Sequence, residues 1–491
     1  KPAKKIYATG NGKCNLTNLF LDSSCYHAGE GDGDVPKVME MLGRFSREDL
    51  LGLFSRMGVP VHSRDGYVYP RTDQAETVAR ALEKEMGRLG IRILTRRQVL
   101  RIDPAENAAG KKGRNNASDH TGDSRRFCIQ TALSAAPASP SGKKNARAAG
   151  RTETAKELSF FDAVILCTGG LAGPSFGCAG DGYRFAGAFS HKIVPPLPAL
   201  TQLVTDDPLI RRAAGVRCHA SVLLLQDESA SASACSTAYE SVCETTCGTS
   251  FHPGCETTIP ETAYRAGRAA PDGDEAGPLT AADAAMIESA GGGIREEGEL
   301  QITDYGISGI PVFQLSGRAA RLLSQGRQLS VRIDFLPEID RLRYAQIVEE
   351  RLLEDRGQML GDLLLGLAHR KVIDLLLARY SLQAEMKARR LSDNQLRRLL
   401  WTLRDFELPI TSVRSFEHAQ VTCGGVPLRE VTDSLESRFC PGLYLAGELL
   451  DVDGRCGGYN LQWAMTSGVI AGRAAAGLPA AGTTGSGGAH P

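Results

Sequence analysis

The stretch PGLYLAGELLDVDGRCGGYNLQWAMTSG (441–468) decides the fold. It opens with a short apolar run typical of a buried strand, passes through a loop rich in Gly and Asp, and ends in a helical pattern. Gly457 and Gly458 open that helix, which we expect to begin at about Asn460, and the amino end of a helix is a site for negative charge. Glu448 follows the strand and a glycine, where its carboxylate could accept hydrogen bonds from sugar hydroxyls. The density of Gly, Asp and Asn before an amphipathic helix favours a ligand site over an ordinary loop.

Two further glycine-rich segments fit the same kind of site. CTGG (167–170) ends the apolar run FFDAVILCTGG (160–170), which has the pattern of a buried parallel strand. Ligands of doubly wound sheets bind beyond the carboxyl ends of the strands. TGNGKCNLTN (9–18) has glycines that let backbone amides approach a ligand, and asparagines that can hydrogen-bond to it. Taken alone, TGNG could be a hairpin turn and CTGG a simple strand end, but the three segments together favour a cofactor site.

Patterned blocks alternate with polar stretches along the rest of the chain. Residues 74–90 repeat apolar groups at helical spacing, and Asp73 with Glu76 has the pattern of a capping box. Residues 91–102 alternate well enough for a pair of strands. Residues 340–407 are dominated by Leu, Arg, Glu and Ala with several helical periods, which predicts a small helical subdomain.

Two segments are short of large apolar residues. Residues 104–157 and 226–297 are rich in small and polar residues, so we expect both to be mobile surface insertions, and the tail from about 478 to be disordered. Four residues in the second segment have a spacing that loosely resembles a zinc site, and we interpret them as part of a solvated insertion instead: Cys243, Cys247, His252 and Cys255.

Composition excludes several classes of protein. The 491 residues, 42% of them apolar, are enough for two or three domains. Lys plus Arg and Asp plus Glu both total 57, and this net charge of zero argues against a nucleic-acid partner. No stretch approaches a membrane-spanning apolar run, and the first residues, KPAKKIYATG, lack the apolar region of a signal peptide. The 13 scattered cysteines suit a reducing cytoplasm better than a disulfide framework.

These motifs resemble those of the BaiN/YhiN family of bacterial FAD flavoproteins. The matching segments run in the family's order and cover most of the chain outside the two insertions: GNGKCNLTN (10–18), YVYPRTDQAETV (67–78), TGG…GDGYRFA (168–186), GELQITDYGISGIPV (298–312), RIDFLP (332–337), VTCGGV (421–426) and residues 441–468. The resemblance implies an α/β fold with a discontinuous Rossmann-like FAD-binding domain, an inserted β-rich subdomain and a small helical subdomain. The expected bounds are 1–191 and 412–477 for the FAD-binding domain, 192–338 for the β-rich subdomain, 339–411 for the helical subdomain and 478–491 for a disordered tail.

The resemblance also implies which residues contact FAD. Carried over by position they are Asn11, Gly12, Lys13, Cys14, Asn15, Thr168, Gly169, Gly447, Glu448, Gly457, Gly458, Asn460 and Leu461, with Val99 at the strand position that typically contacts adenine. Cys14 is interpreted as a packing residue and not as a redox thiol, and position alone does not make Cys456 reactive. Asp451, Asp453 and Tyr459 lie near the expected flavin loop, but each could simply cap it, so no catalytic acid is assigned.

The family opens with a strand, a G-x-G-x-x-G turn and a helix, and this chain starts just after the point where that unit would end. We therefore expect a fragment, the alternative being an incomplete gene. The implied function is a cytoplasmic FAD-dependent oxidoreductase that transfers a hydride between flavin N5 and a small organic substrate, with NAD(P)H as the expected reductant. No nucleic-acid or membrane partner is expected.

Three alternatives stay open. The first is an oxygen-using amine oxidase of the aminoacetone oxidase type, which alone would make hydrogen peroxide from an amine under air. The second is a flavin-carrying protein without turnover, whose helical block 340–407 binds a protein partner. The third is a truncated product without function.

Overall fold

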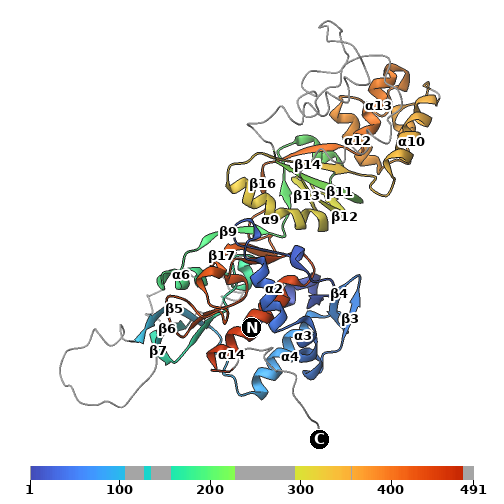
Figure 1. The fold of residues 1–491 in the computed structure, drawn as a ribbon. Coiled ribbons are helices and arrows are strands. Elements are labelled where there is room, and N and C mark those ends of the chain that lie inside the picture. Colours follow the sequence, from blue (N-terminus) through green and yellow to red (C-terminus); the bar gives the residue numbers. More distant parts are fainter. Residues whose placement is uncertain (1, 106–125, 134–155, 227–292, 355, 479–491) are drawn as a thin grey trace, which may run out of the picture. The chain divides into compact units, whose positions relative to one another are not determined.

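The chain divides into two compact units, a discontinuous first unit and an inserted second one (Figure 1). The first comprises residues 1–197 and 420–491, and the second comprises residues 198–419. The finer predicted bounds, including the division of the insert into a β-rich and a helical subdomain, stay predictions. The computed structural model describes residues 2–105, 126–133, 156–226, 293–354 and 356–478.

Short strands dominate the first unit, and one parallel pair positions the site. β8 (Val164–Leu166) pairs in parallel with β18 (Leu443–Leu445), as the run FFDAVILCTGG (160–170) predicts for its second half. The first half is not a buried parallel strand, because Phe160 and Phe161 are exposed and end the antiparallel strand β7 (Lys156–Phe161). The other strands are antiparallel where their pairing is described: β1 (Thr17–Asn18), β4 (Tyr67–Pro70) and β3 (Val61–Arg64) in one sheet, β2 (Tyr26–Ala28) with β19 (Val452–Gly454), and β5 (Arg97–Pro104), β6 (Phe127–Leu133) and β7 (Lys156–Phe161) in another sheet. β17 (Val421–Gly425) pairs with β9 (Val194–Ala199).

Strand β6 corrects one expectation. It lies inside 104–157, which the composition predicts to be a mobile insertion, yet it pairs with β5 on one side and β7 on the other. Phe127 is buried in the main core of the unit, and this burial offsets the cost of ordering a strand between polar flanks. The rest of that segment, 106–125 and 134–155, lies outside the described residues. The strand pair predicted over 91–102 is also wrong, because within that range only β5, from Arg97, is a strand.

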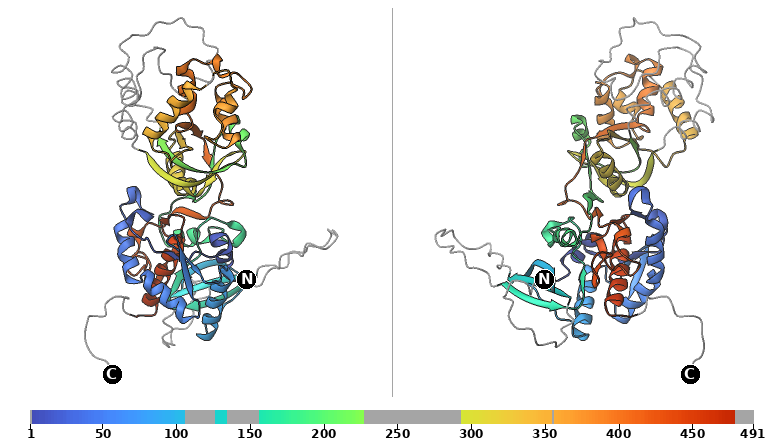
Figure 2. Two further views of the ribbon diagram at one scale, coloured as in Figure 1. Left: turned by 90° about the vertical axis from the view of Figure 1, so that its right-hand side faces the viewer. Right: turned by 60° about the vertical axis from the view of Figure 1, so that its left-hand side comes forward.

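Two helices of the first unit, α2 (Val35–Arg44) and α3 (Arg47–Arg56), pack against α14 (Tyr459–Ala475). Trp463 and Ile470 of α14 are buried in the main core, and α14 lies beside both helices in every view (Figures 1 and 2). This confirms the helix predicted to begin at about Asn460, after Gly457 and Gly458 of the deciding stretch. The remaining helices of the unit are α1 (Lys4–Ala8), α4 (Ala75–Arg88) and α6 (Asp181–Ala188).

The predicted capping box before α4 is wrong. The N-cap of α4 is Gln74, which makes no side-chain capping bond. The Asp73 carboxylate is used elsewhere, because its Oδ1 lies 2.8 Å from His62 Nε2 and its Oδ2 lies 3.7 Å from Lys13 Nζ. Asp73 has a φ of 52°, outside the extended conformation of an N-cap.

The second unit is built on a seven-stranded antiparallel sheet. The strands run in the order β15 (Phe406–Ile410), β14 (Leu329–Asp334), β11 (Arg217–Gln226), β12 (Ile294–Ile302), β13 (Gly306–Gly309), β10 (Leu203–Val204) and β16 (Ser412–Val413). Of the second predicted insertion, 226–297, residues 227–292 lie outside the described residues, and with them the cysteines and histidine at 243–255. The prediction is wrong at the ends of this range, because Gln226 lies in β11 and residues 294–297 lie in β12.

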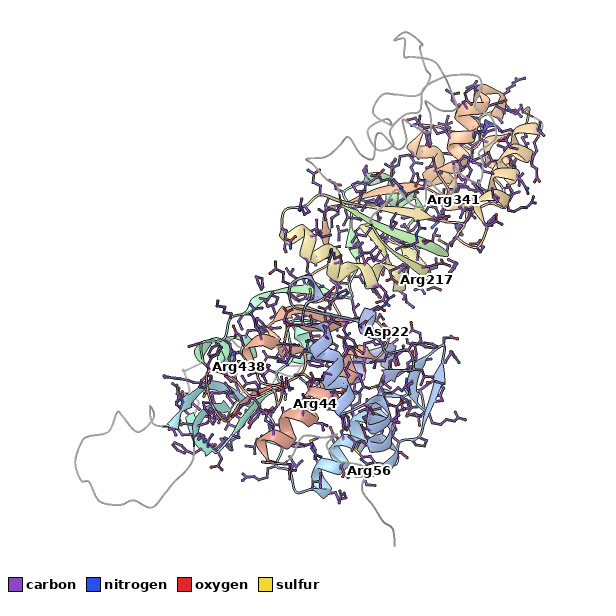
Figure 3. All side chains as sticks on the ribbon, viewed as in Figure 1. Asp22, Arg44, Arg56, Arg217, Arg341 and Arg438 are labelled. Carbon is purple, nitrogen blue, oxygen red and sulfur yellow. The ribbon has the colours of Figure 1, made fainter. Side chains whose placement is uncertain are left out.

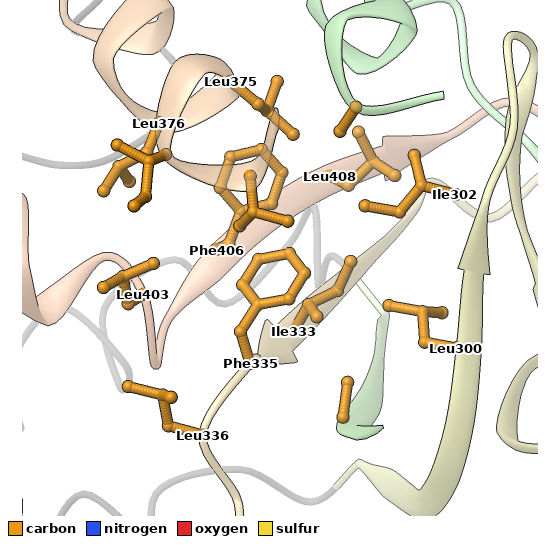
Figure 4. Close-up of a cluster of buried hydrophobic side chains, with 14 of the residues drawn as sticks. Leu300, Ile302, Ile333, Phe335, Leu336, Leu375, Leu376, Leu403, Phe406 and Leu408 are labelled. Atoms are coloured by element: carbon orange, nitrogen blue, oxygen red, sulfur yellow. The ribbon is translucent and has the colours of Figure 1, made fainter. Parts of the chain in front are cut away.

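Helices flank this sheet on both sides, as Figure 1 shows for α9 (Ile310–Ser324) on one side and α10, α12 and α13 on the other. One apolar core joins sheet and helices: Leu375 and Leu376 of α12 lie beside Phe406 and Leu408 of β15 (Figure 4). The helical periods predicted within 340–407 are confirmed as α10 (Arg341–Leu353), α12 (Arg370–Arg379) and α13 (Asp393–Trp401), with the short α11 (Leu360–Leu363) between them.

Charged side chains are spread over both units, as the labelled Arg44, Arg56 and Arg217 illustrate (Figure 3). Several form ion pairs, such as Arg44 with Glu40 and Arg217 with Glu299, so both signs of charge are interspersed on the surface. Across the described ranges, no helix is both long enough and apolar enough to cross a membrane.

Candidate functional site

The candidate site lies where β8 and β18 end. Because these strands run in parallel, the segments that follow them, 167–170 and 446–448, leave the sheet at the same edge. Gly170 packs directly against the second segment: a Cβ there would lie 2.9 Å from Glu448 Oε1 and would collide with the Thr422 hydroxyl. This close approach is the reason why position 170, in the segment after the strand, has to be glycine.

The Glu448 carboxylate is held from two sides. Lys5 Nζ donates to its Oε2 at 2.8 Å, and the Thr422 backbone N–H donates to its Oε1 at 2.9 Å. Thr422 Oγ1 in turn accepts the backbone N–H groups of Leu171 and Ala172 at 2.8 and 3.0 Å. A carboxylate has about four lone-pair sites, so Glu448 keeps acceptor capacity for a ligand hydroxyl while the protein fixes its orientation.

The glycine loop 9–18 is not a hairpin turn. It begins with a 3-10 helix, Thr9–Gly12, and its backbone has positive φ at Asn11 (54°), Gly12 (85°) and Cys14 (60°). Asn11 and Gly12 are exposed, and a Cβ on Gly12 would meet open space. The Cys14 side chain is fully buried, and burial raises the pKa of its thiol to about 11. This burial agrees with a packing role, because a thiol with so high a pKa is a poor nucleophile.

The same loop reaches the amino end of α14. Gly458 immediately precedes the helix with a φ of 94°, and a Cβ there would lie 2.6 Å from the Thr17 carbonyl oxygen and 2.8 Å from Asn15 Oδ1. One residue earlier, the Gly457 carbonyl accepts a hydrogen bond from Asn18 Nδ2 at 3.1 Å. The first and third of the glycine-rich segments therefore meet at the start of this helix.

Three buried side-chain oxygens on or beside the first turn of α14 have no hydrogen-bond partner among the described residues: Asn15 Oδ1, Thr17 Oγ1 and Gln462 Oε1. An unsatisfied buried polar atom costs about 1–3 kcal/mol, so buried polar groups normally find a partner. The free amides of the helix end add partial positive charge. A flavin ring offers hydrogen-bond donors and acceptors and takes negative charge on reduction, so these residues fit it.

Asn460 and Leu461, which the resemblance assigns to the cofactor, support the loop before the helix. Asn460 Oδ1 accepts the Gly454 N–H at 2.8 Å, and its Nδ2 donates to the Gly454 carbonyl at 2.7 Å, so its amide closes the loop. Leu461 packs against the small core that contains Cys14. Gly447 donates its N–H to Ser467 Oγ at 2.9 Å.

The remaining predicted residues lie in three different places. Thr168 and Gly169 directly follow β8, next to the strand-end site. Lys13 lies beside Asp73, and Val99 lies on β5, where it packs against the main core of the unit. Contact of these residues with FAD stays a prediction.

Sequence reasoning missed the roles of Lys5, Thr422 and Gln462. Thr422 lies within the motif VTCGGV and Gln462 within the deciding stretch, but no periodicity separates them from their neighbours. The contact between Lys5 and Glu448 joins residues 443 positions apart, which one sequence does not reveal. Within the described ranges, no three His, Cys, Asp or Glu side chains gather as metal ligands, and all the cysteines there are free thiols.

Comparisons with known proteins show the family of the chain. The model of the HI0933-like protein Rossmann domain matches residues 1–155 and 140–474. The chain is 34% identical over 478 residues to the 3-dehydro-bile acid delta(4,6)-reductase of Clostridium scindens, covering 97% of this chain and 90% of that protein. It is 24% identical over 468 residues to the ribosomal RNA dihydrouridine synthase of Escherichia coli, covering 95% and 88%. A solved quinol–fumarate reductase, at 14% identity and a TM-score of 0.35 over 99% of this chain and 66% of the other, is too distant to support an argument.

Proposed function

The chain belongs to the HI0933-like family of FAD-dependent oxidoreductases, and on that premise we propose that it reduces a carbon–carbon double bond conjugated to a carbonyl group in a small organic molecule. NAD(P)H is the proposed source of electrons. The observation that carries this proposal is the junction of the loop 9–18 with the amino end of α14, near the ends of β8 and β18. Buried polar atoms at this junction have no hydrogen-bond partner among the described residues.

The residues that would hold FAD fall into two groups, one for the flavin ring and one for the cofactor hydroxyls. Asn15, Thr17 and Gln462 have polar atoms to bind the ring, and the amino end of α14 favours negative charge there. Glu448, whose carboxylate is held by Lys5 and Thr422, would accept hydrogen bonds from cofactor hydroxyls. When bound, FAD supplies the hydride chemistry, so the protein needs no nucleophile of its own.

The names of the relatives support a reduction. A delta(4,6)-reductase and a dihydrouridine synthase both add hydrogen to a ring double bond, and the chain resembles the first more closely, at 34% against 24% identity. The relative that acts on ribosomal RNA keeps a nucleic-acid substrate as a second candidate, which the net charge of zero makes the weaker one. No similar observation favours an amine oxidase or a flavin carrier without turnover.

An absorbance spectrum and three turnover assays on the purified full-length protein test the proposal. We expect flavin bands, and oxidation of NADPH or NADH that depends on a cyclic enone. Hydrogen peroxide formed from an amine under air would replace the proposal with an amine oxidase. Reduction of uridine in unmodified ribosomal RNA, without enone reduction, would favour the second candidate. Flavin bands without any reducible substrate would leave a carrier protein, and absence of flavin would refute the cofactor assignment.

A further inference from the structure

Helix α6 (Asp181–Ala188) is seated on the two strand-end segments. A Cβ on Gly182 would collide with Thr168 Oγ1, in the segment after β8, and would lie 2.9 Å from Leu449 Cδ1, just after Glu448. The helix approaches this closely only because it has glycine in its first turn. The next residue, Tyr183, is therefore held beside the candidate site by contacts with both segments.

The Tyr183 hydroxyl is a hydrogen-bond donor without an acceptor in the part of the chain that the structure describes. The side chain is only 8% exposed, and its oxygen has no partner among the described residues. Burial raises the pKa of the phenol, and the nearby Glu448 and Asp451 carboxylates and the Cys178 and Cys423 thiols raise it further. The hydroxyl therefore keeps its proton at neutral pH, although burial without a partner costs about 1–3 kcal/mol. A bound oxygen-containing ligand would remove that cost.

We propose that Tyr183 is the proton donor of the reduction, an inference that rests on the proposed function. FAD, when bound and reduced, would supply the hydride to the β-carbon of the substrate enone, which would leave the electron pair of the double bond on the α-carbon. The α-carbon then takes the proton of the Tyr183 O–H bond, whose electron pair stays on the phenolate oxygen. Water reprotonates the phenolate, so the substrate gains one hydride and one proton in total.

Two of the other candidate donors at the site are engaged. The Tyr459 hydroxyl donates to the Phe20 carbonyl at 2.8 Å, and the Lys5 ammonium is paired with Glu448. The Thr422 hydroxyl accepts two backbone N–H groups, which fixes its position in the strand-end segment. The Thr17 and Thr422 hydroxyls also carry protons, but an aliphatic hydroxyl is a far weaker acid than a phenol, so Tyr183 is the better proton donor.

The test compares Tyr183→Phe with Tyr444→Phe, a buried tyrosine of β18 in the same unit whose charged neighbours are Glu436 and Arg126. Each variant is purified with its flavin and assayed with two acceptors, a cyclic enone and ferricyanide. Ferricyanide takes electrons without a proton on carbon. We expect Tyr183→Phe to slow enone reduction roughly a hundredfold, as the loss of a general acid does, and to leave the ferricyanide rate unchanged. Tyr444→Phe should change neither rate.

A binding measurement distinguishes this inference from the proposed function. 4-Chlorophenol is titrated into the oxidised protein, and its phenolate is followed by its charge-transfer absorbance with the flavin. If the Tyr183 hydroxyl reaches a ligand at the flavin, as proton transfer to the substrate requires, it can also donate to a phenolate oxygen there. Tyr183→Phe should then weaken phenolate binding roughly tenfold, and this can be read even if no enone is reduced. Equal phenolate affinity in the variant and the wild type, absence of phenolate binding in both, or an equal loss of both reduction rates would overturn the role of Tyr183.

Discussion

Lys5 Nζ lies 2.8 Å from Glu448 Oε2, and this ion pair joins the first helix of the chain to the segment after β18. Both side chains are partly exposed, 30% and 19%, so the pair by itself adds about 1 kcal/mol or less to stability. The pair would contribute to FAD binding by orienting the Glu448 carboxylate toward the cofactor. The pair therefore predicts an effect on FAD binding that is larger than its effect on folding.

Lys5→Met should weaken FAD binding roughly threefold to tenfold, because Glu448 loses its oriented partner while keeping the Thr422 N–H. The dissociation constant is measured by adding FAD to the flavin-free protein and following flavin fluorescence. Lys4→Met is the matched control, since the exposed Lys4 is its neighbour on the same short helix. Equal FAD affinities of the two variants would contradict an orienting role.

Gly458→Ala should abolish flavin binding and destabilise the first unit by about 1–3 kcal/mol. Its φ of 94° is strained for alanine, and the new Cβ would press on Asn15 and Thr17. Gly468→Ala is the control within the same helix, where a Cβ meets nothing within 4 Å. It should stabilise the unit by about 0.5–1 kcal/mol, because alanine is the better helix former. Denaturant unfolding followed by the fluorescence of Trp463, in a Trp401→Phe background, measures the stability change in both variants.

The contact between Gly458 and the loop 9–18 was only half predictable from the sequence, which indicates each segment but not that the two meet. Glycines before a helical pattern have a local cause, so the helix, its start and the strand before CTGG could be predicted. Contacts such as Lys5 with Glu448 depend on how distant segments pack, which no local pattern records. Strand β6 was missed because its burial depends on Phe127 meeting the core, while its flanks are polar. Asp73 has the sequence pattern of an N-cap, but its carboxylate hydrogen-bonds to His62 instead.

The buried group of His191, Glu430 and Ser437 predicts a loss of stability in acid. His191 Nδ1 lies 3.0 Å from Glu430 Oε2, and its Nε2 lies 2.8 Å from Ser437 Oγ. Burial lowers the pKa of His191 below its ordinary 6.5, although Glu430 opposes that shift. Below about pH 6.5 the unfolded chain therefore takes up a proton that the folded chain resists. This contribution is fully present above pH 6.5 and is lost as the pH falls toward the folded-state pKa.

His191→Gln should be less stable than the wild type at pH 7.5, by about 1–3 kcal/mol, because Glu430 and Ser437 lose a partner. The variant should also lose less stability than the wild type between pH 7 and pH 5, since glutamine does not titrate. Unfolding midpoints followed at Trp463 across this range measure the difference. Parallel pH profiles of the two proteins would show that His191 does not control the acid sensitivity.

The buried ion pair between Arg404 and Asp334 predicts a large loss of stability of the second unit when one partner is removed. Arg404 Nη2 lies 2.8 Å from Asp334 Oδ2, both side chains are at least nine-tenths buried, and the Arg404 Nη1 donates to the Ile339 carbonyl. Asp334→Asn leaves a buried guanidinium without a counter-charge, which costs about 3–5 kcal/mol. Glu299→Gln, which breaks the exposed pair with Arg217 in the same sheet, should cost less than about 1 kcal/mol.

Unfolding followed at Trp401, in a Trp463→Phe background, isolates this effect because Trp401 lies in the second unit and Trp463 in the first. Flavin content should not change in either variant, since the candidate site is built from residues of the first unit. If Asp334→Asn costs no more than Glu299→Gln, the Arg404 charge is stabilised by something other than Asp334. In that case the double variant Asp334→Leu with Arg404→Met has no lost stability to recover.

If Asp334→Asn does cost several kcal/mol, the double variant identifies the cause. Recovery of most of the lost stability would show that the unpaired charge causes the loss, because well-packed apolar residues often replace a buried ion pair without loss.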